Sequence, residues 1–292
     1  MGLLAQAAQA AHPVRFSVIT PSFRHSGWLK LCIASVADQK VEVEHIIQDA
    51  GSDDGTLDWL PQDSRVKAFV EKDAGMYDGV HRGLRRARGE ILAYLNCDEQ
   101  YLPGTLAAVG DFFAQHPQVD VVFGDFIAVD ARGDYLFHRK VLTPLLHHTW
   151  ISHLQTFTCA TFFRRKLITE RQLFFNPQFR VVGDGEWMLR VLQHKTTMAV
   201  LRRFTSTFTM TGANLGAGAE ARRENLELYR SAPAWVRSLK PLFILHHRLR
   251  RLTGGIYFQR PFSYALYTRE SPQQRVDHQV THPRFRWQAR GS

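Results

Sequence analysis

Glu90-Ile-Leu-Ala-Tyr-Leu-Asn-Cys-Asp-Glu-Gln-Tyr101 is an apolar run that stops abruptly at polar residues, two of them adjacent acids. A short apolar run that follows a glycine is typical of a buried strand in a parallel sheet. Ligands of open α/β sheets bind just beyond the carboxyl ends of such strands. The side chains of Asp98 and Glu99 therefore suit a divalent cation that shares its coordination with a phosphate. The alternative is an acidic turn between a strand and a helix.

The flanking sequence alternates between strand-like and helix-like segments. This alternation predicts βαβ units and an α/β fold, with a mostly parallel, Rossmann-like sheet flanked by helices. Strands are expected at 16–20, 43–47, 66–70, 90–95 and 119–123, and helices at 28–39, 56–60, 76–88 and 102–116. The rhythm breaks after Asp125, where 125–182 holds aromatic, strand-like pieces. Further on, helices are expected at 185–193 and 219–238 and a strand at 200–210.

The composition is that of a globular protein. The chain has 292 residues, of which 45% are hydrophobic and 22% charged. Its three cysteines, Cys32, Cys97 and Cys159, share no close spacing, so neither a disulfide framework nor a zinc pattern is indicated. The first eleven residues lack a basic segment typical of a signal peptide, and no apolar run reaches the roughly 18 residues of a membrane span. These features predict a cytoplasmic protein, either soluble or peripheral at the inner face of the cell membrane.

Positive charge is concentrated near the C-terminus. The formal net charge is +10, and no acid occurs between Glu227 and Glu270, a span that contains eight lysines and arginines. Such asymmetry points to an anionic partner, either lipid headgroups or nucleic acid. From Pro241 a helix is expected with Leu242, Leu245, Leu249 and Leu252 on one face. It either docks on an anionic membrane surface or packs on the domain with its basic face in solvent.

Polar side chains follow each of the first four expected strands. Because the carboxyl ends of parallel strands meet at one edge of a sheet, these side chains are expected to converge. They are Thr20 and Ser22, then Asp49, then Asp73, then Asp98 and Glu99. The interpretation as ordinary polar turns stays open for each one alone. Asp53 and Asp54 are expected to cap the short helix that follows them. Neither a Walker loop nor a dinucleotide-binding glycine motif is present.

Five motifs in this order resemble family 2 glycosyltransferases of the GT-A fold, over about residues 14–215. They are Val18-Ile-Thr-Pro-Ser-Phe-Arg24, Ile46-Ile-Gln-Asp-Ala-Gly-Ser-Asp-Asp-Gly-Thr56, Glu71-Lys-Asp-Ala-Gly-Met-Tyr-Asp-Gly-Val-His-Arg-Gly83, Ala87-Arg-Gly-Glu-Ile-Leu-Ala-Tyr-Leu-Asn-Cys-Asp-Glu99 and Gly183-Asp-Gly-Glu-Trp-Met-Leu-Arg190. The resemblance implies transfer of a sugar, with inversion, from a nucleotide diphosphate donor, with a bias toward UDP. The acceptor would be a glycan or a lipid-linked hydroxyl compound of bacterial surface polysaccharide or glycolipid synthesis.

The resemblance also implies roles for residues of the first half. Thr20 and Ser22 would lie beside the nucleotide, Asp49 would contact its base, and Asp73 would lie in the donor pocket. Asp98 and Glu99 would hold Mn²⁺ or Mg²⁺, although Glu99 stands where a second aspartate is usual.

The second half would supply the acceptor side. Asp184 matches the general base of the family, with Glu186 as the fallback. Both acids open an expected helix, so a first-turn or capping role is the alternative. Trp187 would stack on a sugar or pack in the core. His153 would contact the acceptor or the diphosphate, or be a buried structural histidine. Gly212-Ala-Asn-Leu-Gly216 is similar to a loop that closes over the donor, or is a plain turn.

The expected organisation has four parts. They are a disordered N-terminus at 1–13, a nucleotide-sugar-binding half at 14–125, an acceptor-binding half at 126–216 and a helical basic C-terminal region at 217–292. Two other functions stay open at this point: a nucleotidyltransferase and a non-catalytic nucleic-acid-binding protein. A nucleotidyltransferase would need a basic phosphate loop after the first strand, and the sequence offers only a poor candidate for it. Nucleic acid is not an expected partner of the protein.

Overall fold

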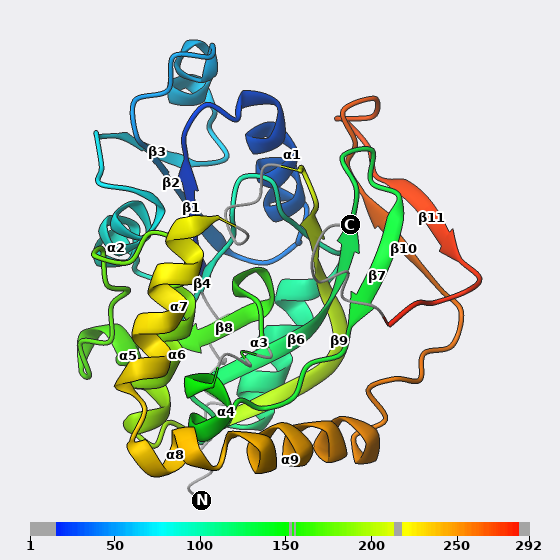
Figure 1. The fold of residues 1–292 in the computed structure, drawn as a ribbon. Helices are drawn as coiled ribbons and strands as arrows, with labels where there is room; N and C mark the ends of the chain where they lie inside the picture. Colours follow the sequence, from blue (N-terminus) through cyan, green and yellow to red (C-terminus); the bar gives the residue numbers. More distant parts are fainter. Residues whose placement is uncertain (1–15, 152–153, 155, 213–217, 286–292) are drawn as a thin grey trace, which may run out of the picture.

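A computed structural model describes residues 16–151, 154, 156–212 and 218–285. Within these residues a nine-stranded sheet runs through the molecule with helices on its faces (Figure 1). The predicted α/β fold is confirmed. The N-terminus predicted to be disordered lies outside the described residues.

The N-terminal half of the sheet is entirely parallel, in the order β3–β2–β1–β4. The strands are β1 (Phe16–Ser22), β2 (Val43–Asp49), β3 (Lys67–Val70) and β4 (Ile91–Tyr94), joined by helices α1 (Ser26–Ala37) and α2 (Met76–Arg86) and by the short 3₁₀ turns η1 (Thr56–Asp58) and η2 (Leu60–Gln62). Every residue of β1 and β4 is buried, as expected for strands with helices on both faces. All four carboxyl ends therefore lie along one edge of the sheet.

The second half of the sheet mixes strand directions. β8 (Thr161–Arg164) lies antiparallel between β4 and β6 (Val121–Val129), and β6 pairs in parallel with β9 (Met198–Thr209) and antiparallel with β7 (Tyr135–Arg139). The two-residue strand β5 (Gln100–Tyr101) pairs with β9, so α3 (Thr105–Gln115) begins later than predicted. The remaining elements of this half are α4 (Leu146–Trp150), η3 (Thr158–Ala160), α5 (Lys166–Thr169) and α6 (Gly183–Gln193).

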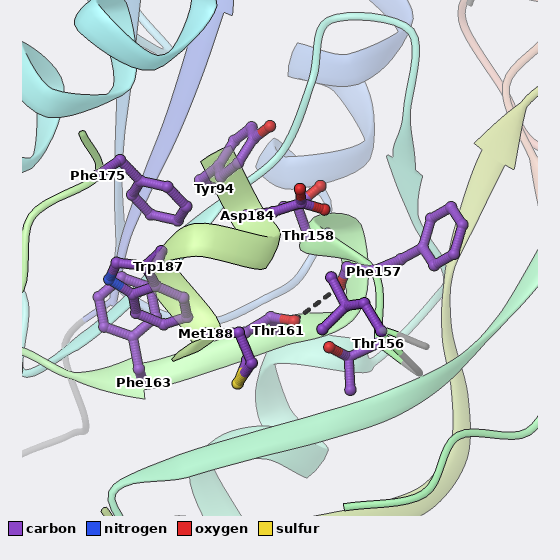
Figure 2. A pocket seen from close by; sticks show the side chains of 11 residues that line it. Tyr94, Thr156, Phe157, Thr158, Thr161, Phe163, Phe175, Asp184, Trp187 and Met188 are labelled. Atoms are coloured by element: carbon purple, nitrogen blue, oxygen red, sulfur yellow. Dashed lines mark hydrogen bonds between the residues drawn. The ribbon is translucent and has the colours of Figure 1, made fainter. Parts of the chain in front are cut away.

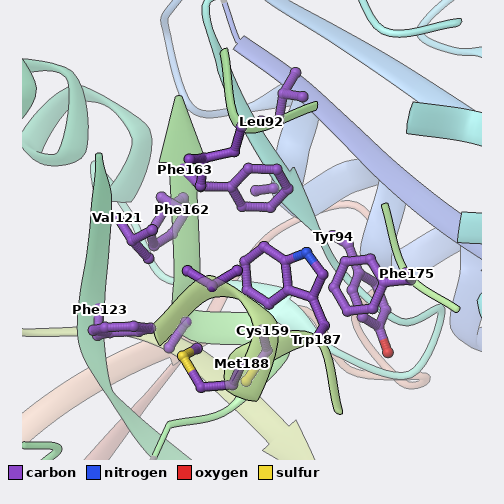
Figure 3. Close-up of a cluster of buried hydrophobic side chains, with 14 of the residues drawn as sticks. Leu92, Tyr94, Val121, Phe123, Cys159, Phe162, Phe163, Phe175, Trp187 and Met188 are labelled. Atoms are coloured by element: carbon purple, nitrogen blue, oxygen red, sulfur yellow. The ribbon is translucent and has the colours of Figure 1, made fainter. Parts of the chain in front are cut away.

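The main core lies where α6 packs on the sheet. Trp187 of α6 is 2% exposed and stacks on Phe175, with the ring centroids 4.9 Å apart. Figure 3 shows it between Phe163 and Phe175, with Tyr94 beyond. The indole Nε1 donates a hydrogen bond of 2.7 Å to the carbonyl oxygen of Leu173. A large ring with its one polar atom satisfied is a stable core residue.

The C-terminal region is helical only in its first part. Helices α7 (Ala219–Ser231) and α8 (Ala234–Ser238) replace the single helix predicted at 219–238, because Pro233 interrupts it. After α9 (Lys240–Thr253) the chain forms an antiparallel hairpin of β10 (Phe262–Leu266) and β11 (Val276–Val280). The prediction of a helical tail is therefore wrong beyond Thr253. Gly254 and Gly255 end the helix, and apolar residues then recur with the two-residue period of a strand.

The hairpin is fastened to the first helix and to the sheet. Arg275 makes a bidentate ion pair with Asp38 of α1, with N···O distances of 2.6 and 2.8 Å. Its guanidinium also donates to the carbonyl oxygen of Tyr101 in β5, at 2.9 Å. The side chain of Gln100 bonds both the backbone N–H and the carbonyl of Tyr267. Side chains of the hairpin complete a small second core over β6 and β7.

Gly83 marks the closest approach of α2 to β1. A Cβ atom at this position would collide with the fully buried side chain of Ile19. We expect Gly83→Ala to lower the free energy of unfolding by about 1–3 kcal/mol through overpacking. Urea denaturation measures the change. The matched control is Gly27→Ala in α1, where an added Cβ meets open space. A variant Gly83→Ala as stable as Gly27→Ala would contradict this packing.

Candidate active site

The acids after β4 occupy a tight turn that points them in different directions. The backbone N–H of Asn96 donates to Glu99 Oε2 at 2.8 Å, and the N–H of Glu99 donates back to the Asn96 carbonyl at 3.0 Å. Glu99 is 1% exposed, whereas Asp98 is half-buried. The predicted role of Glu99 as a metal ligand stays a prediction, because one oxygen of Glu99 is engaged by the turn and the other has no partner among the described residues. Its extra methylene lets the carboxylate fold back and close the turn.

Negative charge gathers around this turn. Burial, followed by the charge of Asp98 and a smaller effect of Asp184, raises the pKa of Glu99. Burial also raises the pKa of Asp98. Glu99 Oε1 is buried and has no hydrogen-bond partner in the described part of the chain, as expected for a carboxyl group that holds a proton. Of this pair, the half-buried Asp98 is the more accessible carboxyl group at the edge of the sheet.

Few side chains at this edge of the sheet could coordinate a metal ion. Among the described residues, no group of three or more histidine, cysteine, aspartate or glutamate side chains could hold an ion. A cation that binds a diphosphate needs only one or two protein carboxylates, since phosphate oxygens and water supply the other ligands. The half-buried Asp98, beside the unsatisfied carboxyl oxygen of Glu99, fits such a shared site.

Asp49, at the end of β2, shapes its own loop. Its Oδ1 accepts hydrogen bonds from the backbone N–H groups of Gly51 and Ser52, and its Oδ2 accepts one from the Ser52 hydroxyl. The side chain is fully buried. Three donors of the following turn engage this carboxylate, and its predicted contact with a nucleotide base stays a prediction.

Asp53 and Asp54, in the turn after β2, make different contacts. Asp54 accepts hydrogen bonds from the backbone N–H and the hydroxyl of Thr56. The N-cap of η1 is Gly55 and no side chain caps this turn, so the predicted capping role of Asp54 is wrong. Asp53 does not cap the turn. It instead forms an exposed bidentate ion pair with Arg24 from the loop after β1.

The polar residues of β1 face inward. The Thr20 hydroxyl lies 2.9 Å from His45 Nε2 and is fully buried, and its predicted place beside the nucleotide stays a prediction. Ser22 is 4% exposed, and its Oγ has no hydrogen-bond partner among the residues described. Of the two, Ser22 is the one with an unused polar atom at the end of the strand.

Asp73 lies in the turn that leads into α2. Its Oδ1 accepts a hydrogen bond of 3.0 Å from the backbone N–H of Gly75, and partial burial raises the pKa of its carboxyl group. The charge of Asp49 adds to this rise, so the ends of β2 and β3 lie within electrostatic reach of each other. This much of the predicted convergence is present in the structure.

Asp184 opens α6 and lines a pocket between that helix and the segment before β8. Its Oδ1 accepts a hydrogen bond of 3.3 Å from the Tyr77 hydroxyl, which also accepts one from the Asp184 backbone N–H at 3.1 Å. Figure 2 shows Asp184 in the pocket wall together with Tyr94 and Thr158. Burial raises the pKa of Asp184. Because its charge acts on both Tyr94 and Glu99, the acid of the second half lies near the acidic turn of the first.

The neighbours of Asp184 on α6 have structural roles. Glu186 forms a bidentate ion pair with Arg190 one turn later, at 2.6 and 2.8 Å, so its carboxylate is already engaged. Trp187 lies in the core described above, which rules out stacking on an exposed sugar and corrects its assignment as a substrate-binding residue. A helix places successive side chains 100° apart, so Asp184 and Trp187 share one side of α6 at different depths.

A buried glutamate of α7 holds the segment that precedes Asp184. Glu224 is 1% exposed and accepts three hydrogen bonds, from the backbone N–H groups of Arg180, Val181 and Val182, at 2.7, 3.0 and 2.9 Å. Glu224 was not among the predicted site residues. No local pattern marks it, because its partners lie 42 to 44 positions earlier in the chain.

Two predicted elements fall outside the described residues. They are His153, and most of the glycine-containing loop at 212–216. The roles considered for them stay predictions.

The fold and the site together define the class of protein. A model of the family described as Glycosyl transferase family 2 matches residues 17–181, which include the four parallel strands and the acidic turn. The chain belongs to this family and is a glycosyltransferase. The nucleotidyltransferase and nucleic-acid-binding alternatives are thereby set aside.

Named relatives agree with this assignment. The chain is 32% identical over 184 residues to a PGL/p-HBAD biosynthesis glycosyltransferase of Mycobacterium bovis, a match that covers 60% of this chain and 68% of the relative. A protein of the same description from Mycobacterium tuberculosis matches equally.

Solved structures of similar fold include TarS and a mannosyltransferase. S. aureus TarS in complex with UDP-GlcNAc superposes with a TM-score of 0.60 at 19% identity, over 73% of this chain and 64% of that one. A mannosyltransferase from Pyrobaculum calidifontis in complex with GDP-Man and Mn²⁺ gives a TM-score of 0.54 at 18% identity, over 82% and 70%. At these identities the similarity establishes the GT-A fold alone.

Proposed function

We propose that the protein transfers a sugar from a nucleoside diphosphate donor, with UDP as the nucleotide, to a hydroxyl group, with inversion at the anomeric carbon. The observation that carries this proposal is the approach of Asp184, from the second half of the sheet, to the acidic turn at Asp98 and Glu99. A single displacement needs a charge-stabilising group for the leaving diphosphate and a base for the acceptor. The two acids supply these functions from opposite sides of one site.

Asp98 is the residue that would hold a divalent cation, Mn²⁺ or Mg²⁺, together with the diphosphate. Bound there, the cation would offset the negative charge that develops on the departing nucleoside diphosphate. Glu99 acts through the turn it closes. Its hydrogen bond to Asn96 fixes the backbone from which Asp98 projects. The complexes of TarS with UDP-GlcNAc and of the archaeal mannosyltransferase with GDP-Man and Mn²⁺ support this view.

Asp184 is the proposed general base. An acceptor hydroxyl is a weak nucleophile near neutral pH, and a carboxylate that removes its proton makes attack on the anomeric carbon feasible. The raised pKa of Asp184 brings its basicity closer to neutral pH. The Tyr77 hydroxyl orients the carboxylate by donating a hydrogen bond to Oδ1, and it also accepts one from the backbone N–H of Asp184. Glu186 is a poorer candidate because Arg190 holds both of its oxygens.

The two halves of the domain then divide the substrates. Residues 14–125 would bind the nucleotide sugar and residues 126–216 the acceptor. The relatives' role in PGL/p-HBAD biosynthesis favours an acceptor of the glycolipid or cell-surface glycan class. The described helices include none long and apolar enough to cross a membrane. We propose separately that the protein acts in the cytoplasm or at the cytoplasmic face of the membrane.

A panel of nucleotide sugars, with release of nucleotide as the readout, tests the proposal. We expect one UDP-sugar to be turned over with Mn²⁺ or Mg²⁺, and Asp98→Asn to lower the rate by about 100-fold, because the charge that holds the cation is lost. The matched control is Asp111→Asn on the exposed side of α3, which should act like wild type. Turnover of no nucleotide sugar, or an unimpaired Asp98→Asn, would refute the proposed function.

A further inference from the structure

Helices α8 and α9 expose an unusual amount of apolar surface. Eight of the thirteen large apolar side chains that are exposed in the described part of the chain lie between Trp235 and Phe258. We call these eight the apolar strip: Trp235, Leu239, Leu242, Leu245, Leu249, Leu252, Tyr257 and Phe258, with exposed fractions from 41% to 68%. Isolated exposed apolar residues are ordinary, but a contiguous group marks an interaction site.

The four leucines of α9 form a single line along the helix. At 100° per residue, Leu242, Leu245, Leu249 and Leu252 fall within an arc of about 80°. The opposite side of α9 faces the protein. His247 is its one buried residue, and Phe243 stacks on His147 of α4 with ring centroids 5.0 Å apart. α9 therefore packs on the domain through its aromatic and histidine side, while its leucine side faces solvent.

Cations border the apolar strip, and acids are absent from this segment of the sequence. Arg248 and Arg260 are exposed, and no aspartate or glutamate occurs between Glu227 and Glu270. The Arg251 guanidinium lies 4.8 Å from the ring centroid of Tyr257. Trp235 and Tyr257 stand at the two ends of the strip, and amphipathic rings of this kind favour the boundary between headgroups and acyl chains.

We propose that the apolar strip docks the protein on the surface of an anionic lipid bilayer. The leucines would enter the headgroup and acyl boundary while Arg248 and Arg260 contact anionic headgroups, with α9 lying in the plane of the surface. A protein partner would bury the leucines equally well. The acid-free border and the terminal aromatic residues favour lipid, since both match the charge and the layered polarity of a bilayer.

The position of the strip gives this docking a use. In Figure 1, α9 runs along one edge of the molecule and α4 lies between it and the rest of the domain. α4 contacts both α9 and α6, and α6 carries Asp184 in its first turn. After α4 the chain reaches Thr156 and Thr158, which line the pocket beside Asp184. A docked protein would thus present its acceptor side near the bilayer, which suits an acceptor held in the membrane.

Co-sedimentation with vesicles tests the proposal without donor or turnover. We compare vesicles of phosphatidylcholine with vesicles in which a third of the lipid is phosphatidylglycerol. We expect wild-type protein to bind the anionic vesicles, and less so at high salt. The double variant Leu245→Ser, Leu249→Ser should lower the partition coefficient at least roughly tenfold. Its control is Leu226→Ser, an exposed leucine of α7 outside the strip, which should bind like wild type.

Charge substitutions separate lipid from other partners. Arg248→Glu should weaken binding to anionic vesicles. Arg85→Glu, which changes an exposed arginine of α2 outside the strip, should not. Absence of wild-type binding to anionic vesicles, or equal binding by the double leucine variant, would overturn the proposal. So would a self-association in sedimentation velocity that the leucine variant abolishes while vesicles fail to bind. Because the assay needs no catalysis, a protein that binds vesicles but transfers no sugar would contradict only the proposed function.

Discussion

Asp184→Asn is expected to lower the transfer rate by about 10³-fold while the affinity for the nucleotide donor stays within a factor of two or so. The asparagine keeps the shape of the side chain and can still accept hydrogen bonds from Tyr77 and from the N–H of Gly185, as the carboxylate does. It cannot take a proton from the acceptor hydroxyl. Calorimetric titration with UDP and a steady-state rate with the identified donor measure the two quantities separately.

The matched control for Asp184 is Glu186→Gln on the same helical turn. Its ion pair with Arg190 is partly exposed, and we expect its rate to stay close to that of wild type. Since the pKa of Asp184 is raised mainly by burial, kcat/KM should fall with decreasing pH as this carboxylate is protonated, and should do so at a higher pH than the ~3.9 of a free aspartate would give. A larger loss in Glu186→Gln than in Asp184→Asn would move the base to Glu186.

Glu224→Gln is expected to be the most damaging substitution outside the site itself. Its Oε1 accepts one backbone N–H and its Oε2 accepts two, so an amide would place its own N–H₂ against at least one donor. Leaving buried N–H groups unsatisfied costs about 1–3 kcal/mol each, and we expect a loss of about 2–4 kcal/mol in the free energy of unfolding. Because residues 180–182 lead directly into Asp184, the transfer rate should fall too, with donor affinity retained.

Urea denaturation and the transfer assay report on the two consequences of Glu224→Gln. The control is Glu220→Gln, one turn earlier on α7, whose ion pair with Arg223 is exposed and should not matter to either measurement. If Glu224→Gln were as stable and as active as Glu220→Gln, the hydrogen bonds from Glu224 to residues 180–182 would not matter for stability or activity.

The first half of the fold could be predicted because its periodicities are local. β1, β2 and β4 are short apolar runs, and α1 and α2 carry apolar residues at helical spacing. The second half could not, because its pairings depend on distant partners. β5 has two residues and exists because Thr207 and Ser206 of β9 lie beside it. The hairpin of β10 and β11 likewise takes its place from contacts with α1 and β5.

The site was predicted in its components but not in their orientations. The motifs singled out Asp98, which lies in the acidic turn, and Asp184, whose charge acts on Glu99 of that turn, and the roles of both stay predictions. The sequence could not show that Asp49 turns toward its own loop or that Glu99 folds inward, since the same side chains can serve either purpose. Likewise, the spacing of Leu242, Leu245, Leu249 and Leu252 fixes a common face, but the direction of that face is set by how His247 and Phe243 pack.

The bidentate contact between Arg275 and Asp38 joins residues 237 positions apart. During synthesis on the ribosome, α1 is made long before Arg275, so Asp38 and the surface beneath the hairpin lack their partners until the hairpin has been made. Closing so long a loop comes late in folding because the entropy of the intervening chain opposes it. The hairpin therefore joins the fold late, and a nascent chain that stops before the hairpin would leave the apolar side of β6 and β7 bare.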